Sequence, residues 1–406
     1  MVARMKVRMS APLAPFAAGF SGELARLGYT ALSARLQLQL MAHVSRWLAS
    51  ERLDAAALTP AAVDRFLAAR RAAGYANHRT AKSLAPLLGY LRAAGAAPPP
   101  PPPAVASTPL EALVERYRRY LLAERGLCAG TVCGYVQVVR PFLAGRAGAE
   151  GLDLERLTAS DVSAYVVAAC REPRGRGGSA RLMVTGLRSL LGFLHLEGII
   201  KESLSGAVPT VAGWRLAGLP RALEPGQVRL LLASCDRGTA GGRRDFAILT
   251  LLARLGLRRG EVAGLQLGQI EWRAGALVID GKGSRRERLP LPADVGEAVA
   301  AYLRHGRPGR AEGRAVFVRV KAPHRALTPG AVTSVVIAAG RRAGLGDVTA
   351  HRLRHSVATE LLRAGAPLEE IGQLLRHRRP LTTAIYAKVD REALRSLARP
   401  WPRGAA

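Results

Sequence analysis

Apolar residues recur three and four positions apart along most of this chain, as in residues 226–235 and 243–256. That period predicts amphipathic helices. One stretch differs, because residues 276–280 form a short β-type run, residues 281–284 indicate a turn, and residues 287–291 indicate a return strand. Helical patterning resumes directly afterwards. The pattern therefore predicts a mainly α, multi-domain chain of the α+β class, with a small antiparallel β-sheet in its C-terminal domain.

Proline and glycine divide the chain. Six consecutive prolines, Pro98 to Pro103, exclude a helix or strand interior and predict a stiff polyproline spacer. A softer boundary rich in Gly and Pro begins at residue 206. The predicted parts are an additional N-terminal helical domain (1–97), a polyproline linker (98–107), a second helical domain (108–205), a linker (206–220) and a C-terminal domain (221–406).

The two helical domains resemble each other in sequence. Stretches beginning at Trp47 and Phe142 each show an aromatic-Leu pair, then Leu-Asp, then Leu-Thr, then a helix with Val in its first turn. The offset between them drifts only from about 95 to 103 residues, which indicates a duplicated helical unit. Independent similarity of two Ala/Leu-rich helical segments is the alternative.

Charge narrows the range of partners. The 406 residues include 60 Lys and Arg against 30 Asp and Glu, a formal net charge of +30. Such a surplus of positive charge opposes folding by self-repulsion, so we expect a polyanionic partner that neutralises it. DNA, RNA and an anionic membrane surface all fit this requirement. No apolar run approaches the roughly 18 residues of a membrane span, and we expect no secretory signal peptide.

The cysteine pattern argues against a metal site. Four cysteines occur, none in a C-x-x-C arrangement, at Cys128, Cys133, Cys170 and Cys235. Reduced thiols in a cytoplasmic protein are the default interpretation. We expect no metal and no cofactor.

The stretch HRLRHSVATELLRAG, residues 351–365, concentrates cationic groups at a predicted helix start. Thr349 is a plausible N-cap and Gly365 a plausible stop. His351 and Arg354 then lie one turn apart on one face, where free N–H groups favour an anion. His351 and His355 have the four-residue spacing of H-E-x-x-H, but no Glu lies between them, which excludes that metalloprotease motif. A solvated basic helix end is the alternative.

Three further pieces could contribute to a phosphate site. GLRRGE contains Arg258 and Glu261, a Gly-Lys-Gly turn contains Lys282, and His377 precedes Tyr386 by nine residues. Each has an ordinary explanation alone: a helix cap at Gly256, a solvated hairpin tip, and a core aromatic. A Tyr set among cations is different, because neighbouring cations reduce the cost of a phenolate.

In this order, GLRRGE, GKG, HRLRHSVATELL and the His-to-Tyr interval resemble the tyrosine recombinase (phage integrase) family. The resemblance covers residues 220–395, and residues 108–200 are similar to the family's helical core-binding domain. The first hundred residues resemble it more weakly. One position departs, because the family usually has Leu-Gly-His where this chain has Leu375-Arg376-His377. An Arg there changes a tight turn and adds charge.

The resemblance implies a site-specific recombinase or integrase that moves a genetic element through a 3′-phosphotyrosyl intermediate, without metal or nucleotide. It implies that Tyr386 is the nucleophile and that Glu261 orients the neighbourhood of Arg258 and His351. The other implied roles are a phosphate clamp (Arg258, Arg354), a proton donor to the leaving oxygen (Lys282), an acid or base near the phenol (His351) and a phosphate hydrogen bond (His377).

The resemblance also implies double-stranded DNA as the partner and a homo-oligomer, a tetramer on paired sites, with exchange of the segment after Tyr386. Six arginines are candidate DNA contacts: Arg171, Arg174, Arg176, Arg181, Arg285 and Arg286. A type IB topoisomerase uses nearly the same catalytic set, and a cleavage-inactive DNA-binding accessory protein would share the charge. Both stay open as alternatives.

Overall fold

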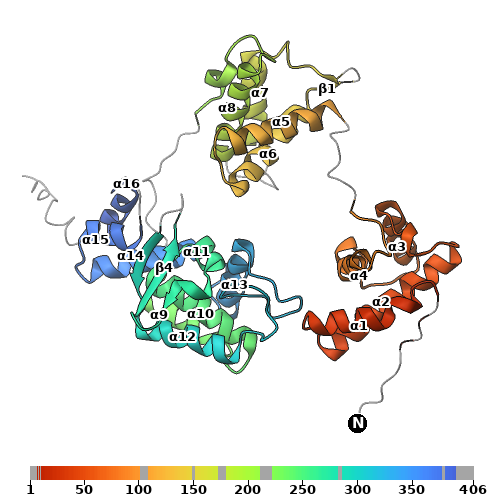
Figure 1. Ribbon diagram of the computed structural model, residues 1–406. Coiled ribbons are helices and arrows are strands. Elements are labelled where there is room, and N and C mark those ends of the chain that lie inside the picture. Colours follow the sequence, from red (N-terminus) through yellow and green to blue (C-terminus); the bar gives the residue numbers. More distant parts are fainter. Residues whose placement is uncertain are drawn as a thin grey trace, which may run out of the picture. The chain divides into compact units, whose positions relative to one another are not determined.

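The computed structural model (Figure 1) describes residues 7, 9, 11–100, 108–148, 151–171, 180–210, 222–281, 286–376 and 380–389. These residues form a mainly helical fold with two small antiparallel sheets, β1-β2 and β3-β4-β5. The predicted fold class is confirmed. The chain separates into two compact units, one of residues 100–215 and one that combines residues 1–99 with 216–406. The predicted domain boundaries stay predictions. No helix within the described ranges is both long and apolar enough to cross a bilayer.

The N-terminal stretch folds into a small helical bundle. Its core contains Phe20, Leu48 and Phe66, among other buried apolar residues. Thr30 and Thr59 cap two of its helices through their side-chain oxygens. Its elements are η1 (Ala14–Phe16), α1 (Ala17–Arg26), α2 (Ala31–Ser50), η2 (Ala55–Ala57), α3 (Pro60–Ala72) and α4 (Ala81–Ala93).

The second stretch has its own apolar core, built around Tyr117, Phe142 and Phe193. A Cβ at Gly186 would lie 2.7 Å from the Cγ2 atom of Val138, so a glycine is needed where α8 packs on α6. Its elements are α5 (Pro109–Ala123), α6 (Ala129–Ala144), β1 (Ala147–Gly148), β2 (Gly151–Leu152), α7 (Ala159–Arg171), α8 (Ala180–Leu196) and η3 (Leu204–Ala207). The short β1-β2 hairpin was not predicted.

The two stretches share local structure at the Leu-Thr pairs noted in the sequence. Thr59 precedes α3 and accepts a hydrogen bond from the backbone N–H of Ala62. Thr158 precedes α7 and accepts one from the backbone N–H of Asp161. These matching caps support the duplication hypothesis, which stays a prediction.

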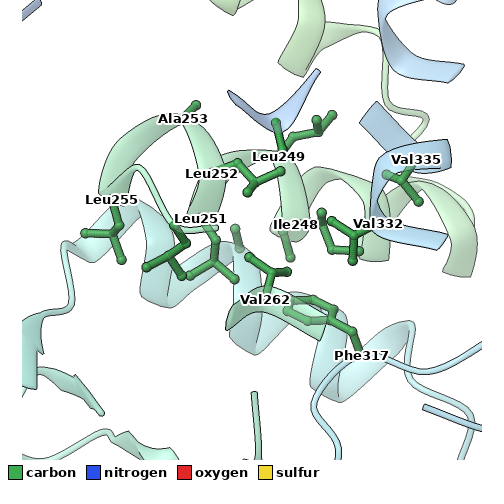
Figure 2. Close-up of a cluster of buried hydrophobic side chains, with 14 of the residues drawn as sticks. Ile248, Leu249, Leu251, Leu252, Ala253, Leu255, Val262, Phe317, Val332 and Val335 are labelled. Atoms are coloured by element: carbon green, nitrogen blue, oxygen red, sulfur yellow. The ribbon is translucent and has the colours of Figure 1, made fainter. Parts of the chain in front are cut away.

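The C-terminal stretch is built around helix α10 (Ala240–Leu255), whose residues Ala247 to Leu252 are all buried. A helix buried on every side belongs at the centre of a core. Figure 2 shows Ile248, Leu249 and Leu252 of this helix within a cluster of buried apolar side chains. The other helices here are α9 (Pro225–Ala233), α11 (Arg259–Gly264), η4 (Leu267–Gln269), α12 (Ala293–His305), α13 (Pro329–Arg342), α14 (Ala350–Arg363), α15 (Leu368–Leu374), α16 (Pro380–Thr383) and η5 (Ala384–Val389).

The predicted β-hairpin is confirmed. Strand β4 (Ala276–Asp280) has the predicted bounds, and the return strand β5 (Arg286–Pro290) begins one residue earlier than expected. Their register pairs Asp280 with Arg286. Strand β3 (Ile270–Glu271) adds a third, unpredicted strand, because two residues are too few to show an alternating pattern.

Helix α14 lies between two apolar clusters. Leu353 belongs to the main core around α10, whereas Val357 belongs to a smaller cluster with Ile371, Leu375 and Tyr386. The predicted caps are confirmed, because Thr349 accepts a hydrogen bond from the Arg352 N–H and Gly365 follows the helix at φ +87°. This placement buries the middle of α14.

Candidate active site

Arg354 is a cation built into the interior beside α14. It is 4% exposed. Its Nη1 donates to the Gly256 carbonyl at 2.6 Å, and its Nη2 donates to the Leu375 carbonyl. Burial, and then the cations of Arg258 and Arg376, lower the pKa of Arg354 to about 10. The guanidinium therefore stays charged at neutral pH, in an environment that favours a compensating anion.

Gly256 makes this arrangement possible. It ends α10 at φ +57°, the left-handed conformation that glycine adopts without steric cost. A Cβ there would lie 2.7 Å from the Cδ2 atom of Leu375. The cap expected from the sequence therefore also places a carbonyl against Arg354.

Arg258 and Glu261 form a second anchored unit at the start of α11. The backbone N–H of Arg258 donates to Glu261 Oε2 at 2.8 Å, and its Nη1 donates to Oε1 at 2.6 Å. Burial acts to raise the pKa of Glu261, but the Arg258 N–H and the cations of Arg376 and Arg258 outweigh it and hold the pKa below its usual value. The side chain of Arg258 is 40% exposed and that of Glu261 only 5%. Arg258 and Glu261 therefore form an ion pair in which the guanidinium is partly exposed and the carboxylate is buried.

Arg376 is the second partner of Glu261. Its Nη2 donates to Glu261 Oε2 at 2.8 Å, and its backbone carbonyl accepts from Arg258 Nη2 at 3.0 Å. Arg376 has φ +56°, the left-handed conformation that is usual for glycine after a helix, so this angle does not show the expected change in the turn. The added charge is buried and paired, and it was missed as a site residue because a sequence does not reveal which acid an isolated Arg will meet.

Tyr386, on η5, is 1% exposed. Its phenol oxygen lies 2.8 Å from Nδ1 of His355, and the two rings meet at an angle of 64°. The His355 ring also meets the His351 ring edge-on, at 4.2 Å between centroids. His351 was expected beside the phenol, but the histidine hydrogen-bonded to it here is His355. The signal was present, since positions four apart share a helix face.

The electrostatics of the phenol differ from the sequence-based expectation. Burial raises the pKa of Tyr386 to about 12, and the Arg354 cation opposes this only in part. Burial, followed by His351 and Arg354, lowers the pKa of His355 to about 4. Desolvation, Arg354 and Arg258 also lower the pKa of His351. Here the phenol is therefore protonated and both histidines are neutral at pH 7.

Several predicted residues lie outside the described residues: Lys282, Arg285, His377, Arg174 and Arg176. Of the remaining candidate DNA contacts, Arg171 is the last residue of α7 and Arg181 is the second residue of α8, and both are exposed. Arg286 is exposed and paired with Asp280 at 3.2 Å. Within the ranges that the structure covers, no group of three or more His, Cys, Asp or Glu side chains could hold a metal.

The described site therefore combines two anchored guanidinium groups with one phenol. Consecutive carbonyls, those of Leu375 and Arg376, hold Arg354 and Arg258 respectively. His355 follows Arg354 directly on α14 and meets the phenol. Guanidinium groups bind phosphodiesters through charge-assisted hydrogen bonds, and a phenol can supply an oxygen nucleophile once it is exposed.

Comparison with known families gives two matches. Residues 221–393 match the phage integrase family, and residues 114–198 match the SAM-like N-terminal domain of phage integrases. The second match lies within the predicted core-binding domain, and the first spans the described site.

Individual relatives of the chain carry names that agree with this family. A protein of Sinorhizobium fredii (strain NBRC 101917 / NGR234), provisionally named integrase/recombinase y4rA, is 40% identical over 96% of this chain and 95% of its own. The tyrosine recombinase XerD of Listeria monocytogenes serotype 4b (strain F2365) is 31% identical over 70% of this chain and 96% of its own.

Solved structures share the fold at lower identity. XerH recombinase bound to a palindromic difH substrate, a post-cleavage complex, has a TM-score of 0.55 and 17% identity, covering 74% of this chain and 99% of that one. A lambda integrase dimer (residues 75–356 of that protein) bound to a COC′ core site has a TM-score of 0.52 and 18% identity, covering 72% and 98%.

Proposed function

This chain belongs to the phage integrase family and is a site-specific tyrosine recombinase, and from that premise we propose that Tyr386 is its nucleophile. The protein cuts and rejoins double-stranded DNA through a 3′-phosphotyrosyl link, and this serves the integration or mobility of a genetic element. The observation that carries the assignment is the Tyr386 phenol, hydrogen-bonded to His355 one residue beyond the buried cation Arg354.

In this reaction the Tyr386 oxygen attacks the scissile phosphorus as the phenol loses its proton. The P–O5′ bond breaks, and the leaving 5′-oxygen takes up a proton. Arg258 and Arg354 hold the non-bridging oxygens, most strongly when charge concentrates in the pentacoordinate state. By position in the family motif, Lys282 donates the proton to the 5′-oxygen and His377 hydrogen-bonds the phosphate. Religation is the reverse sequence.

The described geometry is a resting arrangement. His355 is in reach of the phenol proton, but a phenol pKa of about 12 against an imidazole pKa of about 4 makes that transfer strongly unfavourable. The phenol is also too buried to meet a DNA phosphate. We infer that Tyr386 leaves this position when DNA binds, and that His351 then acts as its acid or base.

Two guanidinium groups of the chain itself supply the positive charge of the site, so we propose a reaction that needs no added metal. The XerH and lambda integrase structures of the same fold are DNA complexes, which supports DNA as the partner. Recombination requires four cleavages on two duplexes, so the working species is a homo-tetramer on paired sites. The protein acts in the cytoplasm.

A nicked suicide duplex tests this proposal. Wild-type protein and Tyr386→Phe are incubated in EDTA with nicked duplexes from both flanks of the protein's own gene, and SDS-resistant adducts are scored. Tyr90→Phe is the matched control, because it also removes one tyrosine hydroxyl, at a position far from Tyr386 in the sequence. We expect adducts with wild type and the control only.

Each other outcome has a definite meaning. An adduct with Tyr386→Phe would show that another residue is the nucleophile. DNA binding without any adduct would favour the accessory role. Plasmid relaxation without joining of two sites would favour the topoisomerase.

A further inference from the structure

Arg376 occupies a backbone position that glycine would take at lower cost. Helix α15 ends at Leu374, Leu375 is its C-cap, and Arg376 follows at φ +56°. This is the helix-terminating position where glycine is usual, because a Cβ is penalised in the left-handed region. Backbone geometry alone therefore selects against arginine here.

The side chain of Arg376 explains what offsets that cost. It is 3% exposed and meets two carboxylates, Glu261 Oε2 at 2.8 Å and Glu287 Oε2 at 3.6 Å. Its Nη1 donates to the Leu374 carbonyl at 3.1 Å. A charge this buried is retained only with partners, since an unpaired one is expensive. Glu287 lies on β5.

Glu261 connects Arg376 to the clamp. One carboxylate serves both arginines: Oε2 accepts from the Arg258 backbone and from Arg376, while Oε1 accepts from the Arg258 guanidinium. The Arg376 carbonyl accepts a further bond from Arg258 Nη2. With Arg376 in place, the carboxylate has a defined orientation, and so does the guanidinium that it holds.

We propose that Arg376 is a positioning residue for DNA cleavage, which aims Arg258 at the scissile phosphate through the shared carboxylate of Glu261. The inference rests on the proposed function, since it takes Arg258 as half of the phosphate clamp. Arg376 touches no reacting atom. Misplacing a clamp group by about 1 Å can cost about 10²-fold in rate, so its loss appears in the chemical step.

Arg376→Gly separates this role from that of a helix cap. Glycine relieves the backbone cost, so a structural cap would be as good or better in the variant. We expect instead that the single-turnover rate of adduct formation, at saturating nicked duplex, falls about 10- to 100-fold, while the Kd for DNA changes less than about threefold. Arg52→Gly is the matched control, because Arg52 is exposed and has φ +55°; its cleavage rate should equal that of wild type.

A double-mutant cycle tests whether the effect of Arg376 on cleavage passes through Glu261. If Arg376 acts through Glu261, adding Arg376→Gly to Glu261→Gln should slow cleavage little further, since coupled residues are not additive. Arg376→Lys retains the charge without the planar fork and should restore only part of the rate.

The outcomes keep the two proposals apart. Wild type that binds DNA but forms no adduct overturns the proposed function, and this inference with it. Wild type that cleaves while Arg376→Gly matches its rate, or losses that simply add in the double variant, overturns the inference alone. Should Arg376→Gly not fold, Arg376→Lys decides, because a full wild-type rate in that variant is incompatible with the proposed role.

Discussion

Replacing Glu261 with Gln tests whether both arginines depend on one buried carboxylate. Glu261 is buried and accepts three hydrogen bonds, two from Arg258 and one from Arg376. Gln has nearly the same shape, but its NH₂ group turns one acceptor into a donor that faces a donor. Removing one partner of a buried ion pair costs about 3–5 kcal/mol. We expect about 3 kcal/mol, the lower end, because the amide oxygen still accepts.

A local measurement suits this multi-domain chain, whose global unfolding need not be two-state. Hydrogen exchange of the α11 peptide at pH 7 reports local opening, and about 3 kcal/mol corresponds to roughly 100-fold faster exchange. The sign with pH also follows. Because the folded pKa of Glu261 is lowered, its contribution is present above the unfolded value of about 4.3 and is lost as pH falls through the folded value. Glu261→Gln has no carboxyl group to protonate at this position, so it should not show this loss of stability on acidification.

Asp347→Asn is the control, since it removes a carboxylate from an exposed pair with Arg341 at 2.8 Å, where little change is expected. Exchange that rises less than threefold in Glu261→Gln, with variant and wild type losing protection in parallel on acidification, would refute the reasoning.

Three further predictions follow from the structure. Gly256→Ala places a Cβ 2.7 Å from Leu375 at φ +57°, so we expect a loss of about 1–2 kcal/mol in thermal unfolding and slower cleavage, because the carbonyl beside Arg354 shifts. NMR titration should find the His355 imidazole neutral at pH 6, because burial lowers its pKa to about 4. The neutral ring therefore stabilises the fold fully above about pH 6.5, the pKa in the unfolded chain, and this stability declines as pH falls toward the folded pKa. The double variant Arg171→Ala/Arg181→Ala should reduce the salt slope of DNA binding by about 1.8, measured by anisotropy.

Each of these predictions has a contrary result. Gly192→Ala is the control for Gly256, because a Cβ at Gly192 meets nothing within 4 Å, and equal stability of both variants would contradict the steric argument. An imidazole of His355 that titrates near pH 6.5 would contradict its burial. An unchanged salt slope would show that Arg171 and Arg181 do not meet phosphates.

The local pattern of the sequence was enough for several elements. The run from Ala276 to Asp280 is a short apolar stretch with β-branched Val and Ile, which favours a strand, and it became β4 with those bounds. Thr349 caps α14 because a hydroxyl oxygen three residues before a free N–H is a local interaction. The two-residue strand β3 escaped prediction, because it is defined by its partner and not by its own residues.

The sequence by itself determined the chemistry available to this protein: its charge of +30, its helical class, and an ordered set of Arg, His and Tyr residues that identifies the family. The tertiary structure decided which groups meet. It brought His355 to the Tyr386 phenol across 31 positions and Arg376 to Glu261 across 115. It also reversed the expected pKa shift of Tyr386 by burying it. The physical reason is that desolvation and pairing depend on distant segments packing together, and no local pattern encodes which segments those are.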